Sequence, residues 1–511
     1  MLAKVYSASV QGLEAQQVTI EVNSARGIRF ALVGLPDNAV KESEQRIRAA
    51  FENSQLRMTG KKVVVNLAPA DLRKEGSGFD LPIAIGILAA TDQIDAAAVS
   101  DTMLVGELSL DGGIKGVRGV LPLAVMAKEQ GIRRMIVPLA NAAEAAIVDG
   151  VEVIAAETLT QVVGYLRGEE SIAPTSAPQF ALDTSVEGRF AEDFADVKGQ
   201  PHIKRALEIA AAGGHNVLMI GAPGSGKTML ARRLPTILPP MTLEEAVEAT
   251  KIHSVAGKLG ETPGLLRTRP FRAPHHLTSQ VALVGGGQSP QPGEVSLAHN
   301  GVLFLDELPE FGRNVLEVLR QPLEDKTITV SRAKYSIEYP ANFTLVAAMN
   351  PCPCGFYNHP TKECTCAPFS IHRYFSRISG PLLDRIDMHI EVAPVAIGEM
   401  TSDRKEESSA EIRRRVIAAR SRQEARFAGL GIHSNAMMNS RMLREFCPLT
   451  EQVRSLLERA MERLNLSARA FDRIIKVART IADLEGADDI STAHIAEAIN
   501  YRTLDRDNWG R

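Results

Sequence analysis

The 511-residue chain contains few cysteines, a single tryptophan and no long apolar run. Five cysteines are too few for the disulfide framework of a small secreted protein. The longest apolar run, Leu81–Ala90, is shorter than the roughly 20 residues that span a bilayer, and residues 1–6 lack the apolar centre of a signal peptide. Charges nearly balance, with 58 Lys and Arg against 61 Asp and Glu, which excludes a histone-like chain but allows a local basic patch. We therefore expect a cytoplasmic protein that makes no contact with a membrane.

The length predicts about three domains. Residues 167–190 are rich in Ser, Pro, Thr and Ala and indicate a linker. Residues 1–166 and 191–395 each alternate short apolar strand patterns with helical patterns, which is typical of α/β domains. The unbroken apolar run at 302–305 favours an inner strand of a parallel sheet. Residues 396–511 show only helical patterns and predict a C-terminal helical domain.

A phosphate-binding motif occupies residues 221–228, with the sequence GAPGSGKT. It follows an apolar strand pattern at 216–220 and precedes a helical run, as the pattern G-x-x-x-x-G-K-[ST] requires. Glycines let backbone N–H groups surround phosphates, the lysine reaches the β- and γ-phosphates, and the threonine hydroxyl binds Mg²⁺. The predicted ATP-binding residues are Gly221, Gly224, Gly226, Lys227 and Thr228.

Polar residues follow two further apolar strands. Asp306 and Glu307 come directly after 302–305, so both carboxylates are expected at the carboxyl edge of the sheet. Asp306 is predicted to bind Mg²⁺, and Glu307 to orient or deprotonate the attacking water. Asn350 follows the strand pattern at 343–347 and is placed to hydrogen-bond the γ-phosphate or the water. The alternative for Asn350 is a turn residue before Pro351.

At this point the chain resembles a known family. Residues 294–307 (EVSLAHNGVLFLDE) and 380–387 (GPLLDRID) are similar to magnesium-chelatase-type AAA+ ATPases. Nearly the whole chain resembles the ComM/YifB subfamily, which has a Lon-like domain of ribosomal-S5 type, an AAA+ module and a chelatase-type helical lid.

The resemblance implies further roles. Asn350 would be sensor 1 and Arg469 would be sensor 2. Arg385 would be an arginine finger supplied to the ATP of a neighbouring subunit, with Arg373 and Arg377 as rivals. A finger acting between subunits implies a ring, which in this family is a hexamer.

The spacing between motifs leaves room for inserted elements. The surplus between Lys227 and Asp306 falls near 267–295, and residues 326–343 alternate like a β-hairpin. In related ATPases a helix-2 insert and a hairpin before sensor 1 occupy these places and project into the ring pore. Lys326, Arg332 and Lys334 are therefore candidate contacts to a DNA backbone, and the basic segments 251–275 and 411–430 are secondary candidates.

Four of the five cysteines lie within residues 352–366. Thiolates so close together can complete a tetrahedral Zn²⁺ site, although the spacing is C-x-C rather than C-x₂-C. The alternative is a loop with four free thiols. We expect a structural zinc bound by Cys352, Cys354, Cys364 and Cys366.

Residues 66–137 resemble the catalytic domain of Lon proteases, through the segments 66–70, 76–81, 105–108 and 112–115. The resemblance places Gly78 and Val117 where Lon-type peptidases have their Ser–Lys dyad. We therefore expect a scaffold domain without peptidase activity.

Two functions remain open from the sequence. The resemblance implies a DNA motor that drives helicase action or branch migration of recombination intermediates during natural transformation. The alternative is a protein-remodelling ATPase related to magnesium chelatase that does not act on DNA. Both require ATP and Mg²⁺.

Overall fold

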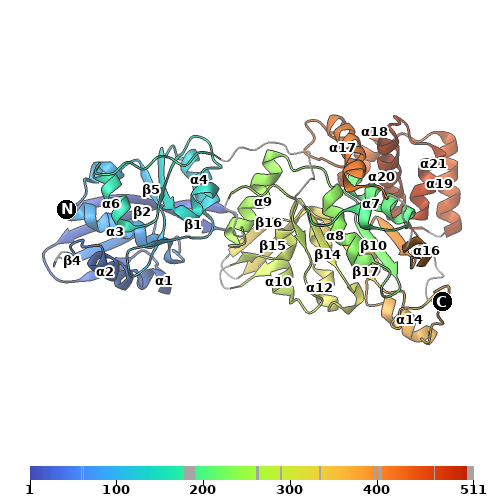
Figure 1. Ribbon diagram of the computed structural model, residues 1–511, viewed down its shortest axis with the longest axis horizontal. Helices are drawn as coiled ribbons and strands as arrows, with labels where there is room; N and C mark the ends of the chain where they lie inside the picture. Colours follow the sequence, from blue (N-terminus) through green and yellow to red (C-terminus); the bar gives the residue numbers. More distant parts are fainter. Residues whose placement is uncertain are drawn as a thin grey trace. The chain divides into compact units, whose positions relative to one another are not determined.

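The computed structural model describes residues 1–58, 60, 62–177, 190–259, 264–287, 290–332, 335–395, 397–400, 406–464 and 466–502. The chain forms two compact units (Figure 1). The first unit comprises Met1–Ala181 together with Leu243–Leu266, and the second comprises Leu182–Thr242 and Arg267–Arg511. None of the described helices is long and apolar enough to cross a membrane.

The first unit is built on a seven-stranded mixed sheet in the order β3-β4-β2-β1-β5-β8-β9. Its strands are β1 (Leu2–Gln11), β2 (Glu14–Ala25), β3 (Phe30–Val33), β4 (Lys62–Ala68), β5 (Thr102–Leu104), β8 (Arg134–Pro138) and β9 (Glu152–Ala156). A short hairpin adds β6 (Glu107–Leu108) and β7 (Ile114–Lys115). The helices are α1 (Asn38–Lys41), α2 (Ser43–Asn53), α3 (Asp80–Ala90), α4 (Val120–Glu129), α5 (Leu139–Ala145), α6 (Leu159–Leu166) and α9 (Leu243–Val255). Every residue of α3 is buried, because this apolar run is a core helix of the unit.

Helix α9 follows elements of the second unit in the sequence but packs within the first. Its Ser254 carbonyl accepts a hydrogen bond of 3.2 Å from the N–H of Gly119, which precedes α4. The Ser254 hydroxyl also donates to the buried carboxylate of Glu144 in α5. The sequence assigned residues 191–395 to one domain and did not predict that α9 would belong to the first unit.

The second unit contains a five-stranded parallel sheet in the order β11-β14-β17-β10-β18. These strands are β10 (Val217–Gly221), β11 (Phe271–Arg272), β14 (Val302–Leu305), β17 (Thr344–Met349) and β18 (Met388–Val392). The predicted strands at 216–220, 302–305 and 343–347 are thus confirmed as β10, β14 and β17. Strand β10 lies between β17 and the edge strand β18, so its carboxyl end is beside that of β17, the central strand.

Helices and two hairpins complete this unit. The hairpins are β12 (Gly285–Gly286) with β13 (Gln291–Pro292), and β15 (Thr327–Arg332) with β16 (Tyr335–Pro340). The helices before the C-terminal region are α7 (Pro201–Gly213), α8 (Lys227–Ile237), α10 (Gln280–Val284), α11 (Glu294–Leu297), α12 (Arg313–Glu317), α13 (Arg320–Asp325), α14 (Pro368–Phe375), α15 (Gly380–Leu383) and α16 (Ile397–Met400). The C-terminal helices are α17 (Ser409–Arg426), α18 (Ser440–Phe446), α19 (Glu451–Leu464), α20 (Ala468–Glu485) and α21 (Thr492–Asn500).

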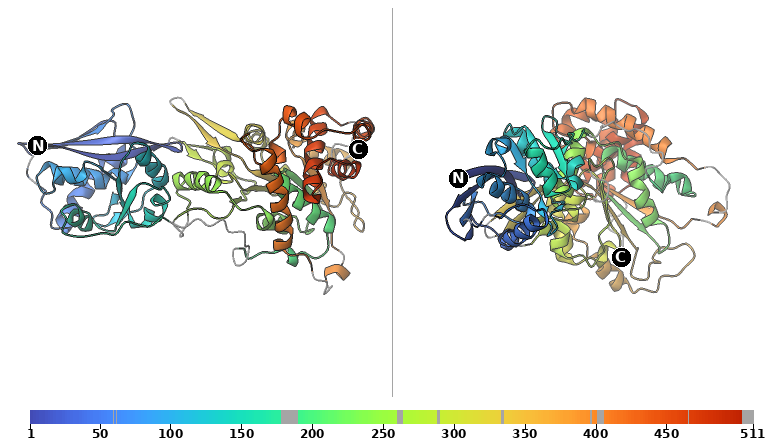
Figure 2. Two further views of the ribbon diagram at one scale, coloured as in Figure 1. Left: turned by 90° about the horizontal axis from the view of Figure 1, so that it is seen from above. Right: turned by 60° about the vertical axis from the view of Figure 1, so that its left-hand side comes forward.

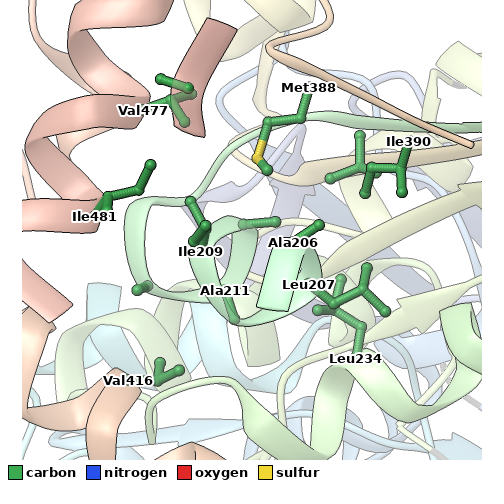
Figure 3. Close-up of a cluster of buried hydrophobic side chains, with 14 of the residues drawn as sticks. Ala206, Leu207, Ile209, Ala211, Leu234, Met388, Ile390, Val416, Val477 and Ile481 are labelled. Atoms are coloured by element: carbon green, nitrogen blue, oxygen red, sulfur yellow. The ribbon is translucent and has the colours of Figure 1, made fainter. Parts of the chain in front are cut away.

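The C-terminal helices share one apolar core with the sheet. Figure 3 shows Ile209 of α7, Met388 of β18, Val416 of α17 and Ile481 of α20 in the same cluster. Capping residues set the helix ends: Ser491 accepts from the backbone of His494, and Gly486 ends α20 in a left-handed conformation. The domain boundary that the sequence suggested between residues 395 and 396 lies within one continuous apolar core, because that core contains residues from both sides of it.

Candidate nucleotide-binding site

The phosphate-binding motif forms the loop between β10 and α8. Gly224 and Gly226 have φ angles of 77° and 90°, which glycine adopts without the strain of a side chain. A Cβ on Gly221 would lie 2.3 Å from the carbonyl oxygen of Val392 in the adjacent strand β18. The glycines therefore allow the turn and the close approach of two strands, and the loop opens at the N-terminus of α8, where partial positive charge favours phosphate.

The Lys227 side chain is held inside this loop. Its ammonium donates hydrogen bonds to the carbonyls of Gly221 at 2.7 Å and Ala222 at 3.0 Å. It also donates to Oδ1 of Asn350 at 3.3 Å. Burial lowers the pKa of Lys227, and the nearby Asp306 carboxylate opposes that shift. The structure thus brings the predicted lysine and the predicted sensor together at one point.

Thr228 and Asp306 meet as the sequence predicts for a Mg²⁺ site. The Thr228 hydroxyl donates to Oδ2 of Asp306 at 2.6 Å. A hydroxyl and a carboxylate are both hard oxygen ligands, and Mg²⁺ bound to a nucleotide takes one or two such groups from a protein. The donor set therefore fits Mg²⁺, with these two side chains as its protein ligands.

Glu307 has a left-handed backbone, with φ 52° and ψ 46°. This conformation costs a non-glycine residue about 1 kcal/mol or more and is often found at functional sites. The Glu307 N–H donates to Oδ1 of Asp306 at 2.9 Å, which secures the turn. The Glu307 side chain is 56% exposed, and its Oε2 lies 3.1 Å from Nδ1 of His276.

His276 is a site residue that the sequence analysis missed. Its ring lies 4.1 Å from that of His275, between centroids, and it precedes α10. An imidazole beside the predicted base can orient that carboxylate or share a proton with it. The only signal in the sequence was a His-His pair within the Gly-, Pro- and His-rich stretch 267–295.

The candidate arginines contact acidic residues of their own chain. Arg385 pairs with Glu324, and both line an open cavity of about 410 Å³. Arg377 pairs with Oε2 of Glu310 at 2.9 Å, while Arg373 is exposed on α14.

Arg469, the candidate sensor 2, pairs with Oδ2 of Asp384 at 3.3 Å. In the part of the chain that the structure describes, the ion pairs of Arg385, Arg377 and Arg469 are thus made outside the phosphate loop. A finger acting between subunits therefore stays a prediction.

The three hairpin cations have different positions. Lys326 is the left-handed residue that ends α13, at the base of the hairpin, and burial lowers the pKa of its ammonium. The side chain of Arg332 and all of Lys334 lie outside the described residues. The hairpin itself, drawn in yellow, extends away from the rest of its unit (Figure 2).

Several arginines of the basic segments are held by groups of their own unit. Arg413 donates to the Leu238 carbonyl, Arg415 pairs with Glu208, and Arg426 pairs with Asp483. In the other segment, Arg272 pairs with Glu294 at 2.6 Å. These arginines hold elements of the unit together, which favours packing roles for them.

The four clustered cysteines converge. Their Sγ atoms all lie within 4.8 Å of one another. Cys352 is 3.3 Å from Cys354 and 3.7 Å from Cys364, and Cys354 is 3.6 Å from Cys364. This donor set fits a zinc ion bound by four thiolates.

In the first unit, the two positions assigned to the Lon dyad lie together. A Cβ on Gly78 would lie 3.6 Å from Cγ1 of Val117. Neither residue carries a nucleophile or a base. The neighbouring Ser77 hydroxyl donates to Glu107, and Lys74 is buried with its ammonium on the Pro69 carbonyl. The Lon-like relationship itself stays a prediction.

The fold and this site define a P-loop ATPase module. Family comparisons agree: the chain matches the family described as "Magnesium chelatase, subunit ChlI" over residues 193–400, "Subunit ChlI of Mg-chelatase" over 20–141 and "Magnesium chelatase, subunit ChlI C-terminal" over 406–502.

Full-length relatives narrow the family further. The chain is 47% identical to competence protein ComM of Haemophilus influenzae, across 99% of this chain and 98% of the relative. It is 45% identical to the uncharacterized protein YifB of Salmonella typhimurium and 44% identical to that of Escherichia coli, with the same coverage. The chain therefore belongs to the ComM/YifB family of magnesium-chelatase-like AAA+ ATPases.

Proposed function

We propose that this ATPase assembles into a ring, a hexamer as its family implies, and uses ATP hydrolysis to move along branched DNA. Its reaction would be branch migration or strand displacement of recombination intermediates during uptake of transforming DNA. The name of the Haemophilus influenzae relative, a competence protein, supports this assignment.

The position of the hairpin β15–β16 carries the proposal. Strand β14 leads into Asp306 and Glu307, and β17 leads into Asn350. The hairpin lies between these two strands in the sequence: α12 and α13 join it to β14, and β16 leads directly into β17. A change at the γ-phosphate can therefore move the hairpin, and a moving hairpin with cations near its tip can pull on phosphates.

Salt-dependent DNA binding tests the proposal. Replacing Arg332 and Lys334 by Ala should weaken binding to all DNA sequences alike, because phosphate contacts carry no sequence information. Each lost contact should flatten the log–log salt dependence by about 0.7 to 0.9. DNA stimulation of ATP hydrolysis and strand displacement should fall together, while hydrolysis without DNA should persist.

A matched control removes the same charge elsewhere. Arg441 and Arg444 are exposed on α18, and their double Ala variant should behave as the parent. If DNA neither binds nor stimulates ATP hydrolysis in the parent protein, the DNA motor is refuted. The protein-remodelling ATPase would then be the better assignment.

A further inference from the structure

The cysteine cluster has the dimensions of a tetrahedral metal site. A Zn–S bond of about 2.3 Å places the sulfurs of an ideal tetrahedron about 3.8 Å apart. The Sγ separations of 3.3, 3.6 and 3.7 Å approach this value. Backbone N–H groups also point at the sulfurs, from Tyr357 to Cys352 at 3.3 Å and from Cys354 to Cys366 at 3.4 Å. Such hydrogen bonds favour thiolates, which are the form that binds metal.

The loop that carries the cysteines has almost no apolar core of its own. Within residues 353–370, all of which the structure describes, Gly355 alone is buried. The loop therefore needs another source of order. A metal bound by four thiolates supplies it, because binding such an ion contributes directly to folding.

This loop also contacts the nucleotide site. Gly355 has a φ of 83° and packs on Pro223 of the phosphate loop, where an added Cβ would lie 2.4 Å from the proline Cδ. The loop starts directly after Asn350, which bonds Lys227. After the last cysteine, Tyr374 on α14 is buried, and burial raises the pKa of its hydroxyl, a shift that the nearby Asn350 backbone opposes. Both ends of the cysteine loop thus lie beside Asn350, and Gly355, near the start of the loop, lies against the phosphate loop.

We propose that Cys352, Cys354, Cys364 and Cys366 bind one Zn²⁺ and that the metal-closed loop braces the nucleotide site through Gly355 and Asn350. The brace holds Pro223 of the phosphate loop in place and holds the side-chain oxygen of Asn350 on Lys227. Nucleotide binding therefore depends on the metal. This inference rests on ATP binding alone and not on any action on DNA.

Metal content and nucleotide affinity test the two halves of the inference. Full-length protein is purified under reducing conditions without chelator. Inductively coupled plasma mass spectrometry should then find one zinc ion per chain. Replacement of the zinc by Co²⁺ should give the absorption bands of tetrahedral cobalt thiolate. The variant Cys364→Ser with Cys366→Ser should lose the metal and bind ATP about tenfold more weakly, the size of one lost hydrogen bond to a charged group. Cys447→Ala, outside the cluster, should change neither property.

Two measurements separate a brace from misfolding. Stripping zinc from the parent protein should weaken ATP binding, and returning Zn²⁺ should restore it. Gly355→Ala should keep its zinc yet weaken ATP binding, because the new methyl group displaces Pro223. Parent protein with no zinc would overturn the metal site. Unchanged ATP affinity in both the stripped protein and Gly355→Ala would overturn the brace. All binding is measured without DNA, so failure of the motor proposal would leave these results unaffected.

Discussion

Replacing Asp387 by Asn is expected to destabilise the ATPase unit by about 3 kcal/mol. Asp387 precedes β18 and is 3% exposed. Its Oδ2 accepts a hydrogen bond of 2.8 Å from the N–H of Asn216, and its Oδ1 accepts one from Arg473 of α20. Burial by itself would raise the pKa of Asp387, but Arg473 and His215 hold it well below its usual range.

The magnitude follows from what the substitution leaves behind. Asn retains the shape and an acceptor for Asn216, but Arg473 loses its counter-charge. Removing one partner of a buried pair costs about 3 to 5 kcal/mol, and the lower end applies because the Arg473 side chain is 19% exposed. Asp384→Asn is the matched control: its partner Arg469 is 61% exposed, so this variant should lose about 1 kcal/mol at most.

Chemical denaturation measures the difference. Two units are expected to unfold in separate transitions, and ATP should shift only the transition of the unit that binds it. Adding Arg473→Met to Asp387→Asn should recover part of the loss, since the unpaired cation is removed. The reasoning is refuted if Asp387→Asn loses no more stability than Asp384→Asn.

Three further predictions concern catalysis and pH. Glu307→Gln should bind ATP but hydrolyse it at least about 100-fold more slowly, because the amide cannot accept a proton; near-normal turnover would remove Glu307 from the mechanism. Arg385→Ala should bind ATP without turnover, and mixing it with Glu307→Gln should restore some activity; no recovery at any ratio counts against a finger in trans. Burial holds the pKa of His389 well below its ordinary value of about 6.5, so its contribution to stability is complete above that pH and is lost as the pH falls. His389→Leu should therefore flatten the fall in melting temperature between about pH 6.5 and 5, and parallel profiles would contradict this.

The sequence predicted the nucleotide site because each part is encoded locally. A strand, a glycine loop and a helix are contiguous from 216 onwards, and Asp306 and Asn350 each end an apolar strand. Parallel strands bring their carboxyl ends to one edge of a sheet, so the sequence predicted that Asp306 and Asn350 would lie at the same edge as the phosphate loop. His276 escaped prediction because it approaches Glu307 from a stretch whose strands, β11, β12 and β13, have only two residues each.

The alternation of residue types along residues 326–343 predicted the hairpin but not the position of its lysine, Lys326. The pattern at 326–343 located β15 and β16, and it suggested that Lys326 would face a ligand. Lys326 instead ends α13 with a φ of 60°, and its ammonium is influenced by Asp387, Lys476 and Arg473. A helix end turns a side chain independently of the strand that follows, and sequence periodicity does not record that turn.

Helix α9 shows what a hydrophobic pattern leaves undetermined. Ala246, Ala249 and Ile252 form a buried stripe at helical spacing, but such a stripe does not identify the surface that covers it. The partner is set by polar groups far away in the sequence. The buried carboxylate of Glu144 accepts the N–H of Leu121 at 2.8 Å, an amide hydrogen of Asn141 at 3.1 Å and the hydroxyl of Ser254.

A buried carboxylate without these donors would be costly, so Ser254 helps to fix α9 on the first unit. The chain enters α9 through residues 238–242, directly after α8, and α8 begins at Lys227. It returns to β11 and then to His276, which contacts Glu307. Helix α9 is therefore connected through the chain, on both sides, to segments that carry residues of the nucleotide site. Any displacement of α8 or of the His276 segment must be absorbed by these connections or be passed to the first unit. These connections arise from the order of the elements along the chain, which no single motif in the sequence contains.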